Sequence, residues 1–565
     1  MKIKSVVKSV MIISIFAVTS CNNPAKPGQK TENYLNTVLD ENFKTVYKIG
    51  DSIDYTGLKV IDFNTKEEIK NYTISPEEGT KLTEPNLEYK ITINVPNYNE
   101  LHEYVAVSKD ITALDETNRE INFYAINDFH GSWNYDTSQN QAGMGKIAYY
   151  LKDKKVNEPY SSVVLSAGDM WQGGVESNKT KGKVVTEAMN YIGFDAMAIG
   201  NHEFDWAEEA IEANKAMMKF PLLNSNIIYS NYGKNPGLRP TYLEPSTIID
   251  REGIKIGIIG SSSEYLGSDI VESVSRQFIF RAPLEYIKNE SDRLRQEGCH
   301  LVVLLTHDPG FDGTSGVPTK FADLTKTSEI SGKRYLDGIF LGHDHLVKSG
   351  EFNGIPFTES GCNGRNVSYV SYKMKKVNGE WVINNYFYNI RSGMNNEIFA
   401  NSLTAMEDLL EKYRPEIGDV DRVIYNFTKS MSKTDFINIA CRAYAYYINN
   451  KSEYENKVFA GIQNTGGVRS NVSAGPFTYA DLIKVIPFSN TITICKVTKS
   501  QYEAIVAANA GVAVRDPNYS SGYEYVATIN YVSEKPEYTI SEVFDTGVLA
   551  QEAIEYYLLN NKGLY

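Results

Sequence analysis

The chain has 565 residues and a formal net charge of −13 at pH 7. Single cores usually stop growing near ~250 residues, so this length predicts several domains. The acidic balance leaves no excess of lysine and arginine to neutralise phosphates along a strand, which argues against a nucleic-acid polymer as partner. A small phosphorylated ligand held by metal ions remains compatible with this charge.

The first twenty residues have the pattern of a secretion signal. Three lysines within the first eight residues precede an apolar stretch over residues 10–18, which suits a signal-peptide core and is too short to span a bilayer. Residues 18–21, Val-Thr-Ser-Cys, match the bacterial lipoprotein signal, so we expect removal of residues 1–20 and lipidation of Cys21. The protein would then be exported and held by lipid on the outer face of the bacterial cell membrane or cell surface. An unmodified Cys21 after an ordinary signal peptide is the alternative.

Residues 21–32 are polar and contain two prolines, which predicts a flexible tether. Residues 33–112 alternate apolar and polar side chains in short runs broken by glycine and proline, which predicts a small all-β sandwich. The stretch 49–58, Ile-Gly-Asp-Ser-Ile-Asp-Tyr-Thr-Gly-Leu, resembles bacterial Ig-like surface domains. Such a domain would hold the following domain away from the membrane.

Four further cysteines are widely and irregularly spaced, which fits neither a zinc knuckle nor a dense disulfide framework. We interpret them as packing residues, and a disulfide between two of them stays open. They are Cys299, Cys362, Cys441 and Cys495.

Residues 118–395 show apolar strand-like runs followed by helix-like segments, which predicts α/β layers. Polar residues follow five of these runs directly, and the ends of strands are where open α/β sheets place their ligand sites. The runs are residues 121–126, 162–166, 196–199, 301–305 and 338–341.

Five of the seven histidines of the chain lie at these strand ends, namely His130, His202, His307, His343 and His345. A lone histidine is usually structural, but five at such positions, beside aspartates and an asparagine, predict a metal centre. Two divalent ions about 3.5 to 4 Å apart need a bridging carboxylate and a mixture of imidazole, carboxylate and amide ligands.

In chain order, Asp-x-His, Gly-Asp, Gly-Asn-His-Glu, a later His and Gly-His-x-His resemble the calcineurin-like metallophosphoesterase family. The hexapeptide at residues 200–205, Gly-Asn-His-Glu-Phe-Asp, resembles its 5'-nucleotidase branch. The resemblance implies a four-layer α/β sandwich with two divalent metal ions, for which Zn, Mn and Fe stay open. It implies Asp128, His130 and His345 on the first metal, Asn201, His307 and His343 on the second, and Asp169 as the bridge.

The same resemblance implies that His202, oriented by Asp205, stabilises charge on the phosphoryl group in the transition state. Residues three apart at a helix start can meet, and a carboxylate beside an imidazole favours the charged imidazolium. Two carboxylates against two dications leave a local charge of about +2, which suits a phosphate monoester dianion.

A linker helix is expected within residues 396–422, because Leu403, Met406, Leu410 and Tyr413 recur at helical spacing. Residues 423–565 resemble the substrate-binding C-terminal domain of the same family, which implies an α+β fold.

Two motifs carry this second resemblance, Asn-Thr-Gly-Gly-Val-Arg from Asn464 to Arg469, which includes Gly466, and Ile-Pro-Phe ending at Phe488. They imply that Asn464 and Arg469 contact ribose and phosphate and that Phe488 stacks on the base. The alternative is an ordinary turn at the glycines and a core role for Phe488.

The chain departs from the family pattern in its last domain. The second arginine expected near residues 431–439 is missing, and Lys433 or Lys429 would replace it only as a point charge. The stretch after Phe488 is shortened, and Tyr531 is the candidate for the second stacking aromatic. A Gly-Gly-Asp-Gly segment is replaced by Glu-Lys-Pro-Glu at residues 534–537. These departures concern base and ribose recognition.

The leading hypothesis is a surface-anchored hydrolase that releases phosphate from extracellular nucleoside 5'-monophosphates. A nucleotide-sugar pyrophosphatase and a 2',3'-cyclic-nucleotide phosphodiesterase share the metal centre and are the alternatives within the enzyme class. A surface adhesin with a relic enzyme domain is the alternative of another class, and the complete ligand set counts against it.

Overall fold

The computed structural model describes residues 12–13, 35–39, 46–48, 50–62, 67–83, 88–99, 102–137, 139–311, 316–392, 401–509, 513–515 and 524–565. The chain divides into two compact units, Met1–Glu120 with Lys373–Asn384, and Ile121–Tyr372 with Asn385–Tyr565. Cys21 and the predicted tether lie outside the described residues, as does the predicted signal peptide apart from Ile12 and Ile13.

The regular secondary structure in the described part of the first unit consists of β-strands. Its two sheets have the orders β1-β2-β4 and β3-β7-β6-β5. A small core includes Tyr47, Ile53 and Val60. The Ig-like assignment stays a prediction. The strands are β1 (Ile12–Ile13), β2 (Leu35–Leu39), β3 (Val46–Lys48), β4 (Leu58–Asp62), β5 (Thr73–Ser75), β6 (Glu88–Asn99) and β7 (His102–Leu114).

The second unit begins with an α/β sandwich. Its first sheet has the order β11-β10-β9-β8-β20-β21, and strands β8 to β11 are parallel. The strands are β8 (Asn118–Ile126), β9 (Ser162–Ser166), β10 (Ala196–Ala198), β11 (Leu222–Leu223), β20 (Asn366–Val377) and β21 (Glu380–Ser392). The helical segments between the first four strands are α1 (Gly143–Asn157), α2 (Val175–Lys179), α3 (Lys183–Ile192), η1 (His202–Phe204) and α4 (Ala207–Met217).

The second sheet of the sandwich has the order β13-β14-β16-β17-β19-β18, and β14, β16, β17 and β19 are parallel. The strands are β13 (Ser246–Arg251), β14 (Ile254–Ser262), β16 (Leu301–His307), β17 (Gly338–Phe340), β18 (Val347–Phe352) and β19 (Ile355–Ser360). A separate strand pair joins β12 (Ile227–Tyr229) to β15 (Phe278–Phe280). The helical segments are η2 (Leu266–Asp269), α5 (Glu272–Ser275), α6 (Leu284–Gln296) and η3 (Thr319–Thr325).

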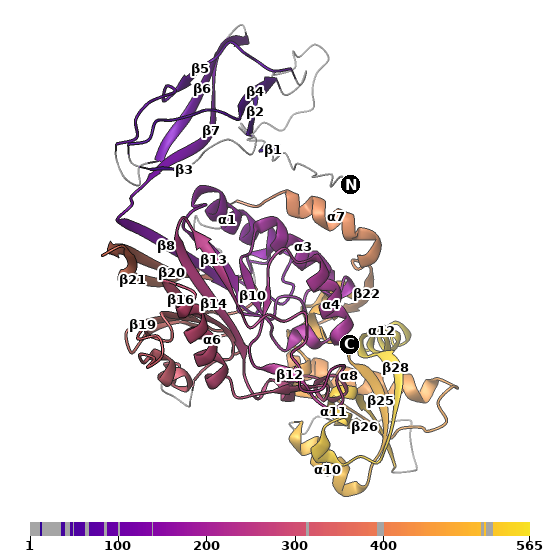
Figure 1. Cartoon of the computed structure of the whole chain (residues 1–565). Helices are drawn as coiled ribbons and strands as arrows, with labels where there is room; N and C mark the ends of the chain where they lie inside the picture. Colours follow the sequence, from indigo (N-terminus) through magenta and orange to yellow (C-terminus); the bar gives the residue numbers. More distant parts are fainter. Residues whose placement is uncertain are drawn as a thin grey trace, which may run out of the picture. The chain divides into compact units, whose positions relative to one another are not determined.

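The two sheets contact each other through β10, which touches β14 and β16. Helix α1 packs on β9 outside one sheet, and α6 packs on β14 and β16 outside the other (Figure 1). This is the predicted α/β sandwich. Its central strands are buried on both faces, as in Ser162–Ser166 and Leu301–His307, because helices or the other sheet cover them.

Strands occupy all five runs that the sequence predicted to end in polar residues. Because β8, β9 and β10 run parallel in one sheet and β16 and β17 run parallel in the other, their carboxyl ends lie at matching edges. The residues that follow them therefore converge.

Helix α7 (Ala405–Ile417) lies within the stretch where the sequence predicts a linker helix, and buries Met406, Tyr413 and Ile417. The domain that follows is α+β, with a sheet of order β26-β23-β27-β25-β28 against α8 and α12, and a strand pair β22 and β24. Its strands are β22 (Val423–Phe427), β23 (Ala460–Ile462), β24 (Gly475–Thr478), β25 (Thr491–Lys496), β26 (Ala513–Arg515), β27 (Tyr525–Ile529) and β28 (Glu542–Leu549). Its helical segments are α8 (Lys433–Asn450), η5 (Thr465–Gly467), α9 (Tyr479–Val485), α10 (Lys499–Ala508), α11 (Asn530–Ser533), η6 (Pro536–Tyr538) and α12 (Ala550–Asn560).

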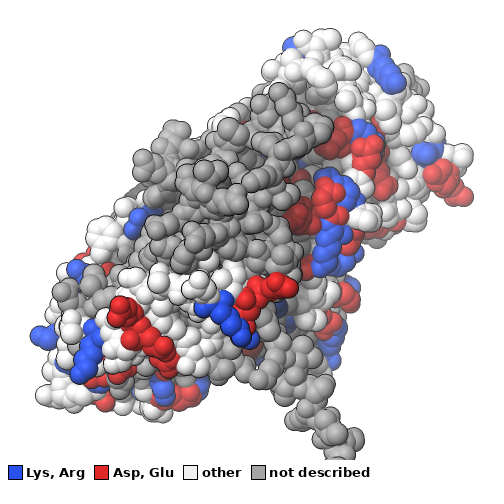
Figure 2. Space-filling model, turned by 90° about the horizontal axis from the view of Figure 1, so that it is seen from above, with Lys and Arg blue, Asp and Glu red and all other residues white. Residues whose placement is uncertain are grey.

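The four cysteines within the described residues form no disulfide with one another, and Cys299, Cys441 and Cys495 are buried, as packing residues are. Among the described residues, no helix combines the length and the apolar character that crossing a membrane requires. Lysines and arginines lie interspersed with aspartates and glutamates on the face shown in Figure 2. No broad basic patch is visible there among the described residues.

Candidate dimetal active site

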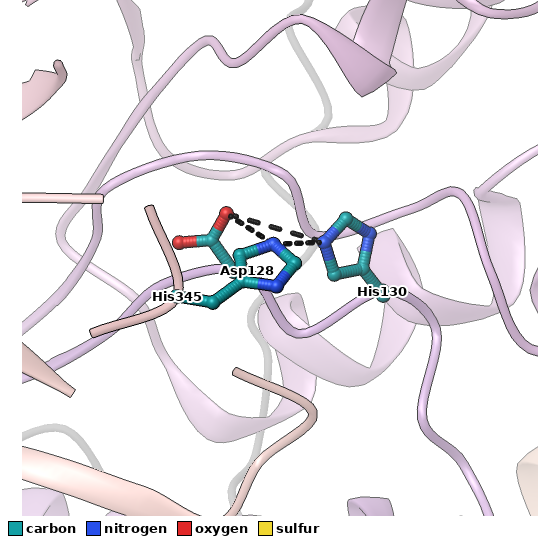
Figure 3. A group of neighbouring side chains, drawn as sticks. All are labelled: Asp128, His130 and His345. Carbon is teal, nitrogen blue, oxygen red and sulfur yellow. Dashed lines mark hydrogen bonds and ion pairs between the residues drawn. The ribbon is translucent and has the colours of Figure 1, made fainter. Parts of the chain in front are cut away.

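The first group of predicted ligands brings together side chains from both sheets (Figure 3). Asp128 and His130 follow β8, whereas His345 follows β17. The Nε2 atoms of His130 and His345 are 3.0 Å apart, and Oδ1 of Asp128 lies 3.3 Å from Nε2 of His345 and 4.0 Å from Nε2 of His130. The three ligand atoms lie within 4.8 Å of one another.

The second group lies at the ends of β10, β16 and β17. Oδ1 of Asn201 is 3.1 Å from both Nε2 of His307 and Nδ1 of His343. Oδ2 of Asp169, which follows β9, is 3.2 Å from Nε2 of His307. The Asp169 carboxylate also clusters with His130 of the first group, so it faces both groups, as a bridging ligand must. The structure thus brings all seven predicted ligands together.

The hydrogen bonds around this site leave nitrogen and oxygen acceptor atoms facing one another. Nδ1 of His130 is 3.0 Å from the carbonyl oxygen of Gln172, and Nδ1 of His307 is 2.8 Å from that of Ala167. Each Nδ1–H donates to a carbonyl, so Nε2 of a neutral ring carries the lone pair. Oδ1 of Asp128 is buried and receives no hydrogen bond. Because a cation between these atoms would satisfy them all, the residues fit divalent metal ions.

The backbone at the site is held in conformations that L-residues rarely adopt. Positive φ angles occur at five predicted ligands, Asp128 (50°), His130 (51°), Asp169 (54°), His343 (101°) and His345 (59°). Each such residue costs on the order of 1–3 kcal/mol and clusters of them mark functional sites. The turns are tight enough to exclude side chains, since a Cβ on Gly200 would lie 2.1 Å from Oδ1 of Asp169.

Both site carboxylates are held in the charged form. Burial alone would raise the pKa of Asp128 and of Asp169, but the neighbouring histidines, above all His345 and His307 respectively, outweigh it and hold both pKa values below the usual range. Burial lowers the pKa of His130 to about 3, so its ring is neutral. The carboxylate of Asp169 outweighs burial at His307 and raises its pKa to about 10. This site demands a positive charge, which a proton or a metal ion can supply.

His202 and Asp205, the predicted transition-state pair, are in contact. Nδ1 of His202 is 3.1 Å from Oδ2 of Asp205, and Nε2 of His202 lies 4.0 Å from Oδ2 of Asp169. Burial alone would lower the pKa of His202, but the carboxylates of Asp205 and Asp169 outweigh it and raise the pKa to about 8. At neutral pH the imidazole is therefore mostly charged, with Nε2 directed at the metal site.

Two positioning residues were missed by sequence reasoning. Glu203 is fully buried, and its carboxylate accepts backbone N–H bonds from Asp169 (2.9 Å), Met170 (2.8 Å) and Gly200 (2.8 Å). It thereby ties the loop after β9 to the loop after β10. Burial and the charge of Asp169 raise the pKa of Glu203 to about 7. The only hint in the sequence was the place of Glu203 directly after His202 in the motif at residues 200–205.

Asn127 is the second of these residues. Its Nδ2 donates to Oδ2 of Asp128 at 2.7 Å and to the carbonyl of Gly361 at 2.7 Å, while its Oδ1 accepts from the backbone of Ser360 at 2.8 Å. The amide therefore orients a ligand against the loop after β19. Only the position of Asn127 beside Asp128 hinted at this.

A cavity of 540 Å³ joins the metal site to the C-terminal domain. All five predicted substrate residues line it, together with six residues of the catalytic group. They are Asn464, Gly466, Arg469, Phe488 and Tyr531 on one side, and Asp169, Asn201, His202, Asp205, His343 and His345 on the other. The centroids of the His202 and Phe488 rings are 5.5 Å apart, and the Arg469 guanidinium lies 5.5 Å from the Phe488 ring. Phe488 is partly exposed, so the core role considered for it is wrong.

The lysine that could replace the missing arginine lines an adjoining cavity of 730 Å³. Lys433 is exposed there, and Arg469, Gly466 and His345 line both cavities. Lys429 lines neither of these two cavities, so Lys433 is the better placed of the two candidates.

The comparison with known families rests on both halves of the second unit. Residues 121–347 match the calcineurin-like phosphoesterase model, and residues 416–537 match the model of the 5'-nucleotidase C-terminal domain. The chain belongs to the 5'-nucleotidase family of metal-dependent phosphoesterases.

Individual relatives are distant. A 5'-nucleotidase of Vibrio cholerae is 27% identical over 410 residues, which cover 65% of this chain and 71% of that protein. Endonuclease YhcR of Bacillus subtilis is 23% identical over 427 residues, which cover 71% of this chain and 34% of that protein. The chain thus spans about a third of the length of the latter relative.

The fold is similar to the crystal structure of a 5'-nucleotidase precursor from Thermus thermophilus. The TM-score is 0.62 at 17% identity, and the match covers 78% of this chain and 96% of that one. At this identity the likeness shows the fold alone.

Proposed function

We propose that this family member is a 5'-nucleotidase that releases phosphate from extracellular nucleoside 5'-monophosphates. The observation that carries the proposal is the 540 Å³ cavity, because four of the seven predicted metal ligands and the aromatic rings of Phe488 and Tyr531 line the same space. A nucleotide has the matching parts, a phosphate for the metal site and a flat base for the rings.

Different residues of the chain have different roles in this proposed reaction. Two divalent ions bound by the seven ligands would supply Lewis acidity and an activated water. His202, charged and oriented by Asp205, donates from Nε2 to a phosphoryl oxygen as negative charge develops on it. Arg469 adds a second positive charge beside Phe488, which stacks on the base.

The test is a comparison of kcat/KM for the purified ectodomain with four nucleoside 5'-monophosphates, a nucleotide sugar, a 2',3'-cyclic nucleotide and para-nitrophenyl phosphate. The proposal expects the monophosphates to be the best substrates. A preference of more than tenfold for the nucleotide sugar or the cyclic nucleotide would overturn the substrate assignment, and inactivity on every ester would favour the relic-enzyme alternative.

A nucleotide-sugar pyrophosphatase is the second candidate, favoured by the 730 Å³ cavity that adjoins His130 and His345. Arg365 lines this cavity, and its Nε is buried without a hydrogen-bond partner. A guanidinium in that state suits a further phosphate group. Arg365→Ala would then lower kcat/KM for the nucleotide sugar about tenfold or more while leaving the monophosphates within threefold.

We further propose that a lipid on Cys21 anchors the protein at the cell surface and that an Ig-like domain stands between anchor and enzyme. The support is the sequence pattern of residues 1–21. Expression of Cys21→Ala in a bacterial host should move the activity from the membrane fraction to the soluble fraction. Retention of the variant in the membrane fraction would refute the anchor.

A further inference from the structure

A carboxylate of the catalytic domain, outside the predicted site residues, faces the substrate cavity. Asp269 is the last residue of η2 and lines the cavity together with Phe488, Tyr531 and the metal-site residue Asp169. Its Oδ2 lies 3.5 Å from Nε2 of His343, and its side chain is 44% exposed. No lysine or arginine of the described residues lies within ion-pair distance of it. A carboxylate accepts up to about four hydrogen bonds, so most of its acceptor capacity is free.

The segment around Asp269 is held firmly. Leu266 and Ile270, on either side of it, are buried at 0% and 4% exposure. A few residues on, the backbone N–H of Ser273 donates to Oε2 of Glu534 at 2.8 Å, which ties this loop to the C-terminal domain. That domain also carries Tyr531, so the carboxylate and the ring are positioned by one set of contacts.

Asp269 lies between the two places where the ends of a nucleotide would bind. It touches His343 on the metal side. On the aromatic side, Tyr531 lines the same cavity as Asp269, and burial and then the negative charge of Asp269 raise the pKa of Tyr531. In a nucleoside 5'-monophosphate the ribose joins the phosphate to the base. The ribose would therefore pass this carboxylate.

We propose that Asp269 accepts hydrogen bonds from the vicinal 2'- and 3'-hydroxyls of ribose and so makes the enzyme selective for ribonucleotides; this inference rests on the proposed function. The two oxygens of a carboxylate can each accept from one of two adjacent hydroxyls. A site that hydrogen-bonds a substrate hydroxyl prefers the substrate to the analogue that lacks it, because those hydrogen bonds are not made with the analogue. The alternative role is to orient His343 alone, as carboxylates do for metal-binding histidines.

Substrates with and without the ribose hydroxyls distinguish ribose binding by Asp269 from orientation of His343. Adenosine, 2'-deoxyadenosine and 2',3'-dideoxyadenosine 5'-monophosphates share the phosphate and the base, and para-nitrophenyl phosphate lacks the ribose. The metal-loaded enzyme should prefer the ribonucleotide to the dideoxynucleotide by about 10- to 100-fold in kcat/KM, the usual range for hydrogen bonds to a charged group. Asp269→Ala should reduce this ratio to within about threefold and keep the activity on para-nitrophenyl phosphate.

Asp269→Asn preserves the side-chain volume and serves where the alanine variant does not fold. Glu272→Gln removes a carboxylate from the same loop that does not line the cavity, and should leave the ratio unchanged. An unchanged ratio in both Asp269 variants, or an equal loss on all four substrates with reduced metal content, would overturn the inference and assign Asp269 to His343. Hydrolysis of para-nitrophenyl phosphate without hydrolysis of any nucleotide would instead overturn the proposed function, and this inference with it.

Discussion

The charge on His202 should depend on Asp205, and the pH profile of the enzyme measures this. Nδ1 of His202 is 3.1 Å from Oδ2 of Asp205, and the pKa of His202 is raised to about 8 although burial opposes its charge. A hydrogen bond to a charged group contributes about 1.5–3 kcal/mol, and one pKa unit corresponds to about 1.4 kcal/mol. Asp205→Asn should therefore lower the pKa of His202 by about 1 to 2 units.

The direction of the pH dependence follows from which protonation state of His202 is active. The protonated imidazole stabilises the phosphoryl charge, so the rate falls as pH rises through the pKa of His202. For a shift from about 8 to about 6.5, the protonated fraction drops about fourfold at pH 7 and about 30-fold at pH 9. The loss in Asp205→Asn should thus grow with pH, and the alkaline limb should move to lower pH.

The assay is kcat/KM for adenosine 5'-monophosphate between pH 5.5 and 9.5 at saturating metal, with metal content measured for each protein. Glu209→Gln is a matched control, because Glu209 is an exposed acid near the start of α4, four residues further along. A pH profile of Asp205→Asn that runs parallel to that of the unmodified enzyme would refute the reasoning, since Asp205 would then not set the charge of His202.

Three further predictions concern the metal, the imidazole and the base. Dialysis against a strong chelator should abolish phosphatase activity and added Mn or Zn should restore it, because the seven ligands converge on one site that demands positive charge; an undiminished rate in metal-free protein would contradict this. His202→Ala should lower kcat by roughly 10² to 10⁴ at nearly unchanged metal content, measured by elemental analysis, and loss of both metals would show that His202 is a ligand. Phe488→Ala should raise KM for all four common nucleoside 5'-monophosphates by similar factors, about 5- to 150-fold, because stacking acts on every base alike. In the unmodified enzyme, a spread in kcat/KM beyond about a hundredfold among these substrates would reveal a base-specific pocket.

Sequence alone determined the catalytic chemistry of this protein to a large extent. Histidines, aspartates and an asparagine follow five apolar runs within a few residues, and parallel strands bring their carboxyl ends to one edge of each sheet. That rule brings the ends of β8 and β9, with Asp128 and Asp169, to one edge of a single sheet, whereas the meeting of Asp128 with His345, 217 positions away, also needs the packing of the two sheets. The motif at residues 200–205 likewise predicted the contact of His202 with Asp205, because a separation of three residues at a helical turn is short enough to be decided locally.

Tertiary structure alone decided how these groups are supported and what they face. The hydrogen bonds that Glu203 accepts from two loops, the left-handed backbone at the ligands and the place of Asp269 beside His343 all depend on segments that meet only after folding. The closeness of Phe488 to His202 depends on packing between two domains. Such contacts join residues far apart in the chain, and no local propensity or periodicity encodes them. Their positions follow from the whole packed core.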